Sequence, residues 1–323
     1  MELGMIGLGR MGGAMTQRLL AHGHRCVVHA RSPAKRAAFV AKGARVAEDL
    51  PALVAALAAP RTVWLMVPAD AVSGVLEELT GLLAAGDLVV DGGNSHYRDS
   101  VQRAGQLTAH GIDFIDAGVS GGVWGSRRGY CLMVGGSASA VARLTPVLRD
   151  LAPGRGELAP TPGLMSASSA PDGYLHCGPS GCGHFVKMVH NGIEYGLMAA
   201  YTEGFNLLHE AAKAGDSENF AFDLPAIAEL WRRGSVVGSW LLDLAARTLA
   251  KDADLADFST AVADSGEGRW TVQAGLDAAV PLPVIGAALN ARFASRERDA
   301  FANRLLSGLR FEFGAHPDSR ADG

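Results

Sequence analysis

Residues 3–12 read Leu3-Gly4-Met5-Ile6-Gly7-Leu8-Gly9-Arg10-Met11-Gly12, an apolar run followed by three glycines spaced as G-x-G-x-x-G. The apolar run predicts a buried strand, and residues 14–21 have the pattern of a helix. In that setting the first glycine allows a tight turn, the second lets the backbone approach a pyrophosphate, and the third lets the helix pack on the strand. We therefore expect Gly7, Leu8, Gly9, Arg10, Met11 and Gly12 to bind a dinucleotide at the N-terminus of a helix.

The second predicted strand, Cys26 to His29, ends where the adenosine ribose of a dinucleotide is expected. NAD-binding proteins usually carry Asp or Glu there, whereas an Arg accommodates the 2′-phosphate of NADP. This chain has Ala30 in the acid's place, followed by Arg31 and Ser32, and Arg is a strong bidentate phosphate donor. The alternative is that Arg31 is a solvated loop residue. We expect NADP as the cofactor, with NAD possible.

The first half continues to alternate short apolar runs with amphipathic stretches. Further strands are predicted at 63–67, 88–90, 114–116 and 132–134, the last of them closing the series, with a helix at 71–83. This alternation predicts an α/β Rossmann-type domain with a mostly parallel sheet and helices on both faces. Residues 152–173, rich in Pro, Gly and Ser, are expected to form a long surface loop.

After Gly183 the pattern becomes helical, at 184–213, 224–231, 236–249 and 271–279, without convincing strands. The predicted domains are therefore 1–176, which binds the dinucleotide, and 177–323, an all-helical substrate and dimerisation domain with a C-terminal tail.

A lysine lies on the first of these helices. At 3.6 residues per turn, Lys187, His190, Asn191 and Glu194 share one face. The remaining circumference is apolar, so we expect a buried helix whose polar face looks into a polar cavity. Proton-exchanging groups gathered inside a protein are typical of an active site, although a structural ion pair between Lys187 and Glu194 is the alternative.

Composition narrows the class of protein. The 323 residues are 48% hydrophobic and 19% charged, which suits a compact protein of two domains. The net charge of -4 gives no reason to expect nucleic acid, and no charge-free stretch is long enough for a membrane span. Four cysteines lack paired metal-ligand spacing, so no metal is expected. Without a recognisable signal peptide we expect a cytoplasmic protein.

Further motifs are Asp91-Gly92-Gly93-Asn94-Ser95, Ser120-Gly121-Gly122, Gly268-Arg269-Trp270-Thr271, Arg292 and the tail Arg310-Phe311-Glu312-Phe313-Gly314-Ala315-His316. Together with the glycine-rich loop and the segment 184–195, they resemble the 6-phosphogluconate dehydrogenases. The resemblance is to the short bacterial form within the β-hydroxyacid dehydrogenase superfamily, and it covers nearly the whole chain.

The resemblance implies oxidative decarboxylation of 6-phospho-D-gluconate to ribulose 5-phosphate and CO2 with reduction of NAD(P), in the pentose phosphate pathway. By this analogy Lys187 is the general base that takes the 3-hydroxyl proton as hydride leaves C3, and Glu194 protonates C1 of the enediol. His190 and Asn191 complete the catalytic set, and Val67, Pro68 and Asn94 join the cofactor contacts. The sugar acid would be held by Asn94, Ser120, Gly121, Gly122, His190 and Asn191, and its phosphate by Tyr195, Arg292, Arg310 and His316.

The chain departs from the long form of this family in two ways. Ser265 stands where the long form has a phosphate-contacting lysine, and a large helical region before the tail is missing. In the family the tail reaches into the partner subunit, which implies a homodimer or higher homo-oligomer with shared active sites. A tail that packs on its own subunit is the alternative.

Two other functions stay open. A non-decarboxylating β-hydroxyacid dehydrogenase would need Lys187 and the Ser-Gly-Gly turn, but not Glu194 or a phosphate site. A dinucleotide-binding regulator without catalysis would tend to have lost the lysine or its neighbours.

Overall fold

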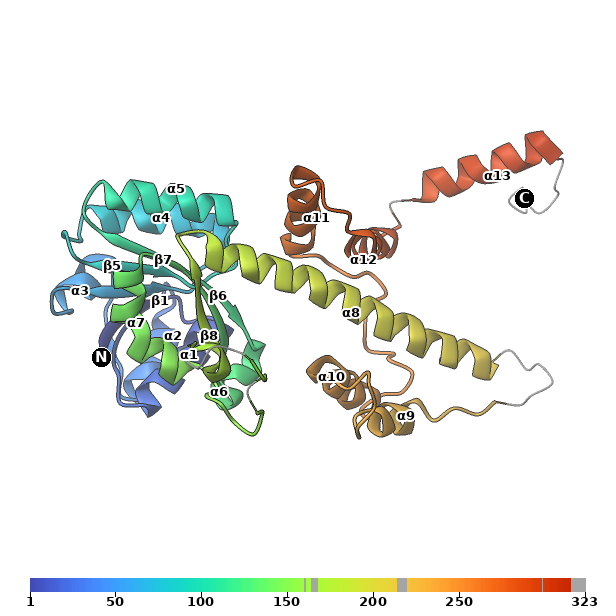
Figure 1. The fold of residues 1–323 in the computed structure, drawn as a ribbon, viewed down its shortest axis with the longest axis horizontal. Coiled ribbons are helices and arrows are strands. Elements are labelled where there is room, and N and C mark those ends of the chain that lie inside the picture. Colours follow the sequence, from blue (N-terminus) through green and yellow to red (C-terminus); the bar gives the residue numbers. More distant parts are fainter. Residues whose placement is uncertain (160, 164–167, 214–219, 298, 315–323) are drawn as a thin grey trace. The chain divides into compact units, whose positions relative to one another are not determined.

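The computed structural model describes residues 1–159, 161–163, 168–213, 220–297 and 299–314, and its elements are labelled in Figure 1. Two compact units divide the chain, Met1–Val189 and His190–Gly323. In the part of the chain that is described, no helix is both long and apolar enough to cross a membrane.

The first unit contains one eight-stranded sheet in the order β3-β2-β1-β4-β5-β6-β7-β8. Neighbouring strands run parallel except β6 and β7, which are antiparallel. The strands are β1 (Glu2–Ile6), β2 (Arg25–His29), β3 (Arg45–Val46), β4 (Thr62–Leu65), β5 (Leu88–Asp91), β6 (Asp113–Ser120), β7 (Cys131–Gly136) and β8 (Tyr174–Gly178).

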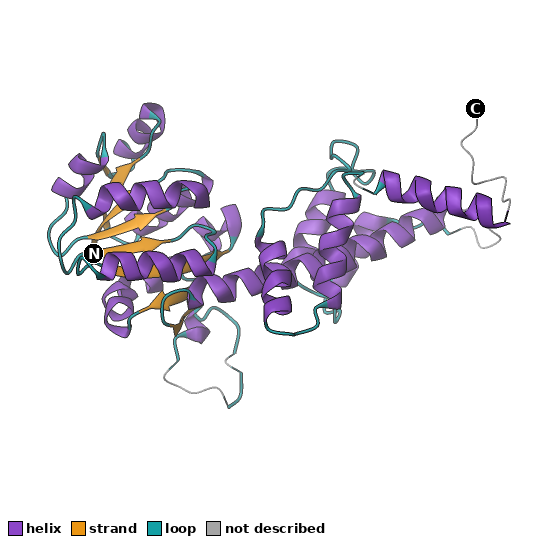
Figure 2. Ribbon diagram, turned by 90° about the horizontal axis from the view of Figure 1, so that it is seen from above, coloured by secondary structure: helices purple, strands orange, loops and turns teal. Residues whose placement is uncertain are grey.

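Helices cover both faces of this sheet, because the strands bury apolar side chains on both sides. One core includes side chains of α1 (Arg10–Ala21), α2 (Pro33–Val40) and α7 (Ala138–Leu151). The other includes side chains of α3 (Leu50–Ala55), α4 (Ala69–Thr80) and α5 (Tyr97–Thr108). Figure 2 shows the strands between these layers. The predicted Rossmann-type domain with a mostly parallel sheet is confirmed.

The prediction that residues 132–134 close the sheet was wrong, since β8 pairs in parallel with β7 beyond them. Tyr174-Leu175-His176-Cys177-Gly178 lacks both a continuous apolar run and a clean alternation, so periodicity gives no signal there. β8 spans the expected domain boundary at 176/177, which stays a prediction, and the chain divides into its two compact units between Val189 and His190. In the described parts of 152–173 the regular element is the short 3-10 helix η2 (Ala170–Asp172).

All described elements of the second unit are helices (Figure 2). Asp223 and Ser239 accept hydrogen bonds from the first turns of α9 and α10, which explains where these helices begin. The sequence pattern did not resolve α12 and α13. The helices are α8 (Cys182–Lys213), which begins in the first unit, α9 (Leu224–Trp231), α10 (Trp240–Leu249), α11 (Glu267–Asp277), α12 (Pro283–Ala294) and α13 (Ala300–Gly314).

The expectation that α8 is buried all round was wrong. Lys187 and Asn191 are buried, whereas Val186, Ile193 and Leu197 are 40%, 53% and 45% exposed. Apolar and aromatic residues of α8 lie on a buried side, which includes Met188 and Tyr195, and also on an exposed side, which includes Ile193 and Leu197. The polar positions at 187 and 191 therefore lie on the covered side of the helix.

Candidate functional site

Most of the residues expected to bind the dinucleotide lie at one edge of the sheet. β1, β2, β4, β5 and β6 are parallel, so their carboxyl ends share that edge. The order of the strands reverses between β1 and β4, and ligands of such sheets bind at this reversal. The edge carries Gly7–Gly12 after β1, Arg31 and Ser32 after β2, Val67 and Pro68 after β4, Asn94 after β5, and Ser120, Gly121 and Gly122 at the end of β6.

Three glycines shape the loop between β1 and α1. Gly7 has φ +99°, and a Cβ there would lie 2.4 Å from the carbonyl oxygen of Met66. A Cβ on Gly12 would lie 2.0 Å from the carbonyl oxygen of Gly7. Gly9 is exposed, precedes α1, and a Cβ on it would meet no atom within 4 Å. The open space at Gly9 lets a ligand approach the backbone, so the loop fits a dinucleotide pyrophosphate.

The end of β2 is rich in positive charge. Arg31 is exposed, and the hydroxyl of Ser32 accepts from Lys35 N at 3.4 Å, which caps α2. Arg36, which sequence reasoning did not single out, donates to the carbonyl of Ala30 at 2.6 Å. A second guanidinium therefore lies beside the position where a 2′-phosphate is expected. Its only sequence signal is that it follows Arg31 by five residues.

The loop that carries Asn94 is stabilised by hydrogen bonds to a buried carboxylate. Asp91 accepts hydrogen bonds from Gly93 N at 3.1 Å and Ser95 Oγ at 2.7 Å. Arg103 of α5 donates to the same carboxylate at 3.3 Å. Neither Asp91 nor Arg103 was assigned a role from the sequence, because their function is to fix the loop and leave Asn94 exposed.

Lys187 is 7% exposed and lies against β6. A Cβ added to Gly118 would be 2.3 Å from the Cβ of Lys187, so the absence of a side chain at 118 allows the lysine stem to pass. Ser120 follows two residues later on the same face of the strand. Ser120 pairs with Cys131 on the antiparallel strand β7. Burial raises the pKa of the Cys131 thiol, and the charge of Lys187 partly offsets this increase.

The second unit holds the other polar residues expected on α8. His190 Nδ1 lies 3.2 Å from Asn191 Oδ1 and 3.7 Å from the Glu194 carboxylate. His190 and Glu194 are about one-third exposed, so water or a ligand can reach them. Glu194 thus has His190 as an ion-pair partner, and the ion pair between Lys187 and Glu194 stays an alternative prediction.

Tyr195 and Arg292, both of which were expected to bind the phosphate, lie together. The guanidinium of Arg292 is 3.7 Å from the centre of the Tyr195 ring. The backbone N–H of Ser265 donates to the Tyr195 hydroxyl at 3.4 Å, so Ser265 also lies here. Hydrogen bonds from Arg269 and Arg296 hold the pKa of neighbouring Asp264 below its usual range, against the effect of burial.

The tail is only partly described. Arg310 lies on α13, on an exposed stretch of the helix. His316 lies outside the described residues.

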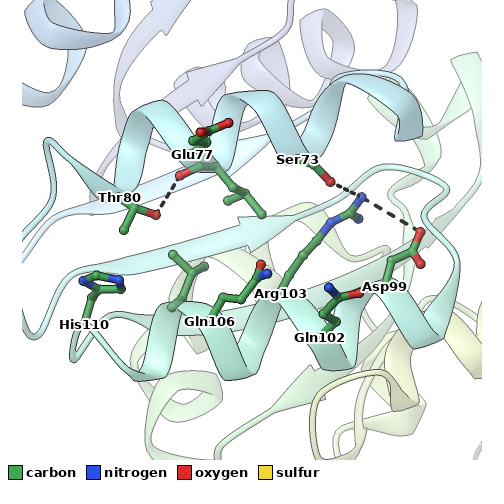
Figure 3. A pocket seen from close by; sticks show the side chains of 10 residues that line it. Ser73, Glu77, Thr80, Asp99, Gln102, Arg103, Gln106 and His110 are labelled. Carbon is green, nitrogen blue, oxygen red and sulfur yellow. Dashed lines mark hydrogen bonds and ion pairs between the residues drawn. The ribbon is translucent and has the colours of Figure 1, made fainter.

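A cavity of about 700 Å³ in the first unit contains none of the expected site residues. It lies between α4 and α5, and Figure 3 shows the Arg103 guanidinium between Ser73 and Asp99 on its wall. Through Arg103, this wall is linked to Asp91 and hence to the loop of Asn94.

Two family models match the chain. The NAD binding domain of 6-phosphogluconate dehydrogenase matches residues 2–158, and the 6-phosphogluconate dehydrogenase C-terminal domain matches residues 183–312. A 6-phosphogluconate dehydrogenase of Haloferax volcanii, named as NAD(+)-dependent and decarboxylating, is 43% identical over 100% of both chains. The YqeC protein of Bacillus subtilis is 39% identical over 98% of each chain.

Longer enzymes are also similar. The chain is 36% identical to a decarboxylating 6-phosphogluconate dehydrogenase of Cunninghamella elegans and covers 62% of it. The solved structure of Plasmodium falciparum 6-phosphogluconate dehydrogenase, described in complexes with NADP+ and with 6-phosphogluconate, aligns with a TM-score of 0.77 and 26% identity. That alignment covers 97% of this chain and 65% of the other.

The different surroundings of two glycines lead to a prediction. Gly12→Ala should lower the melting temperature, because its Cβ would overlap the Gly7 carbonyl. Gly9→Ala should leave the melting temperature unchanged and weaken dinucleotide binding, because its methyl group would occupy the space for the pyrophosphate. Calorimetric melting and titration with dinucleotide measure both effects, with Gly74→Ala, also in open space but on α4, as the control. Unchanged binding by Gly9→Ala would contradict the site.

Proposed function

The chain belongs to the 6-phosphogluconate dehydrogenase family, and from that premise we propose that it oxidises and decarboxylates 6-phospho-D-gluconate to ribulose 5-phosphate and CO2. The observation that carries the proposal is Lys187, a lysine buried against Gly118 and beside the Ser120–Gly122 turn. In the reaction, bound NAD(P) accepts the hydride from C3 of the sugar acid.

We propose that the chain's own residues divide the work as follows. The loop Gly7–Gly12, with Val67, Pro68 and Asn94, holds the dinucleotide at the carboxyl edge of the sheet. Ser120, Gly121 and Gly122 hold the sugar acid together with Asn94, His190 and Asn191. Tyr195, Arg292, Arg310 and His316 bind its phosphate, and the close packing of Arg292 on Tyr195 supports the first two of these assignments.

Proton transfer is assigned to α8. Lys187 would take the proton of the 3-hydroxyl as hydride leaves C3, and return a proton to the keto oxygen as the C1 carboxylate is lost. Glu194 would then protonate C1 of the enediol, while the neutral amine of Lys187 would take the proton from the enediol oxygen, which becomes the carbonyl of ribulose 5-phosphate. A general base needs a neutral amine near the working pH, and a buried position disfavours the charged form of a lysine.

The alternative dehydrogenase, which does not decarboxylate, has no use for Glu194 or for a phosphate site. Glu194 in contact with His190, and the pair Tyr195 and Arg292, favour the decarboxylating reaction.

An assay with three substrates tests the proposal. We expect dinucleotide reduction and release of labelled CO2 from C1 with 6-phosphogluconate, and much lower rates with gluconate and 3-hydroxyisobutyrate. Lys187→Ala should lower turnover by at least ~10²-fold, the usual contribution of a general base, with little change in dinucleotide affinity. Exposed Lys251→Ala serves as the control. Turnover of 3-hydroxyisobutyrate without CO2 release from 6-phosphogluconate would sink the proposal.

We propose NADP as the preferred cofactor, because Ala30 cannot repel a 2′-phosphate and Arg31 can bind it. Arg31→Ala should lower kcat/KM for NADP by roughly 10- to 100-fold, the value of a charge-assisted contact, and leave NAD little changed. Arg25→Ala, at the opposite end of β2, is the matched control. The NAD(+)-dependent relative makes the wild-type comparison decisive: a clear preference for NAD would refute the assignment.

We also propose a homodimer, or a higher homo-oligomer, in which the tail of each chain completes the site of its partner. The exposed apolar stripe of Ile193 and Leu197 supports association, because such side chains are costly to leave in water. The cytoplasmic location expected from the sequence stays a prediction.

Mixed dimers test the sharing of sites. Truncation after Leu309 should raise KM for 6-phosphogluconate far more than KM for the dinucleotide. A heterodimer of this truncated chain with a Lys187→Ala chain would hold one intact site and one doubly damaged site, so activity should recover on mixing. No recovery in verified heterodimers would show that each tail serves its own subunit.

A further inference from the structure

The strand β6 presents alternating residues to two different environments. Ile115, Ala117 and Val119 belong to the apolar core on one face of the sheet. Asp116, Gly118 and Ser120 point to the opposite face, since side chains alternate along a strand. Gly118 is the residue against which Lys187 packs. The face of β6 that meets α8 therefore carries, in order along the strand, Asp116, Gly118 and Ser120.

Asp116 is a completely buried acid. Its Oδ1 accepts a hydrogen bond from Gly181 N at 2.6 Å, and its Oδ2 accepts one from His184 N at 2.8 Å. The N–H of His184 belongs to the first turn of α8, where a helix has unsatisfied donors and the positive end of its dipole, and the N–H of Gly181 lies immediately before that turn. The carboxylate therefore binds the helix at its first turn by two charge-assisted hydrogen bonds.

Glycines bring the backbones together at this point. A Cβ on Gly183 would lie 2.4 Å from the Asp116 carbonyl oxygen and 2.5 Å from that of Met133. A Cβ on Gly135 would lie 2.5 Å from Asp116 Oδ1 and 2.7 Å from Gly183 N. The start of α8 is thus fixed against both β6 and β7 with no side chain between them.

A side contact with α5 holds the same turn. The buried ring of His184 shares a hydrogen bond of 2.7 Å between its Nδ1 and Ser100 Oγ. The next residue, Phe185, meets the ring of Tyr97 edge to face at 5.0 Å. These contacts orient the helix about its axis, whereas the Asp116 carboxylate determines how far along β6 the helix begins.

We infer that Asp116 is a positioning residue for Lys187. His184 and Lys187 are three residues apart, about 4.5 Å along the helix. Because the helix is rigid over this length, a displacement of its backbone at His184 would displace Lys187 by the same amount. Asp116 and Gly118 are two residues apart on one face, so the carboxylate and the space for the lysine stem are fixed by the same strand. The inference rests on the proposed role of Lys187 as the base.

Asp116→Asn is the sharpest substitution. It keeps the size of the side chain, but its amide NH2 would face a backbone N–H that needs an acceptor. We expect a 10- to 100-fold lower kcat for the substrate that the wild type turns over, because a displacement of about 1 Å can have this effect. KM for the dinucleotide should change less than twofold, and hydrogen exchange at the amide of His184 should become faster.

A double-mutant cycle separates positioning from stability. If Asp116 acts through Lys187, Asp116→Asn should lower kcat in the wild type and have no further effect on the residual rate of Lys187→Ala. Ile115→Val removes a methyl group from the opposite face of the same strand and controls for general destabilisation. Additive losses, or an equal loss of kcat in Ile115→Val, would overturn the inference.

If Asp116→Asn does not fold, Asp116→Glu keeps the charge and displaces it by one methylene. It should lower kcat in the same non-additive way, and wild-type kcat in this variant would equally overturn the inference. A failure of the proposed function gives a different result. In that case the wild type does not oxidise 6-phosphogluconate, or Lys187→Ala retains full activity. Either result would be independent of the rate of hydrogen exchange at the amide of His184.

Discussion

The rest of the structure depends on the direct packing of the first turn of α8 on β6 and β7. Backbones meet at Gly118, Gly135 and Gly183, where any side chain would overlap a neighbouring atom. Packing this close excludes water, so the donors at the start of the helix require an acceptor from the protein, and Asp116 supplies it. The sheet and the start of the helix, up to Val189, thereby belong to one compact unit, and Lys187 lies within it.

Local patterns in the sequence were sufficient for much of this fold. The loop Gly7–Gly12 is a contiguous motif in which Gly7 and Gly12 lie against backbone atoms and Gly9 faces open space, as the motif predicts. Strands such as β1 and β5 contain short apolar runs without alternating polar residues, as expected for a sheet covered on both faces. The face of α8 with Lys187 and Asn191 follows from helical periodicity alone, and both side chains are buried.

Other features were not predictable because their causes lie far away in the sequence. β8 is a strand because β7 offers it an edge, not because its own residues prefer one. Asp116 stands in an apolar run, and only the amides of Gly181 and His184, 65 and 68 residues later, explain it. The burial of Arg103 is likewise explained only by its hydrogen bond to Asp91, which lies twelve residues earlier on another element. The apolar residues of α8 suggested burial, but periodicity cannot tell whether the same chain or another one provides the cover.

The alternation along β6 has a consequence for how such a sequence can change over time. Because every second residue faces α8, inserting or deleting a single residue within Asp113–Ser120 would reverse the faces of all strand residues on one side of the change. The set Asp116, Gly118 and Ser120 would then be divided between the helix side and the apolar core, and so would the set Ile115, Ala117 and Val119. No compensating substitution at one position could restore both faces. The length of this strand should therefore be invariant among related chains.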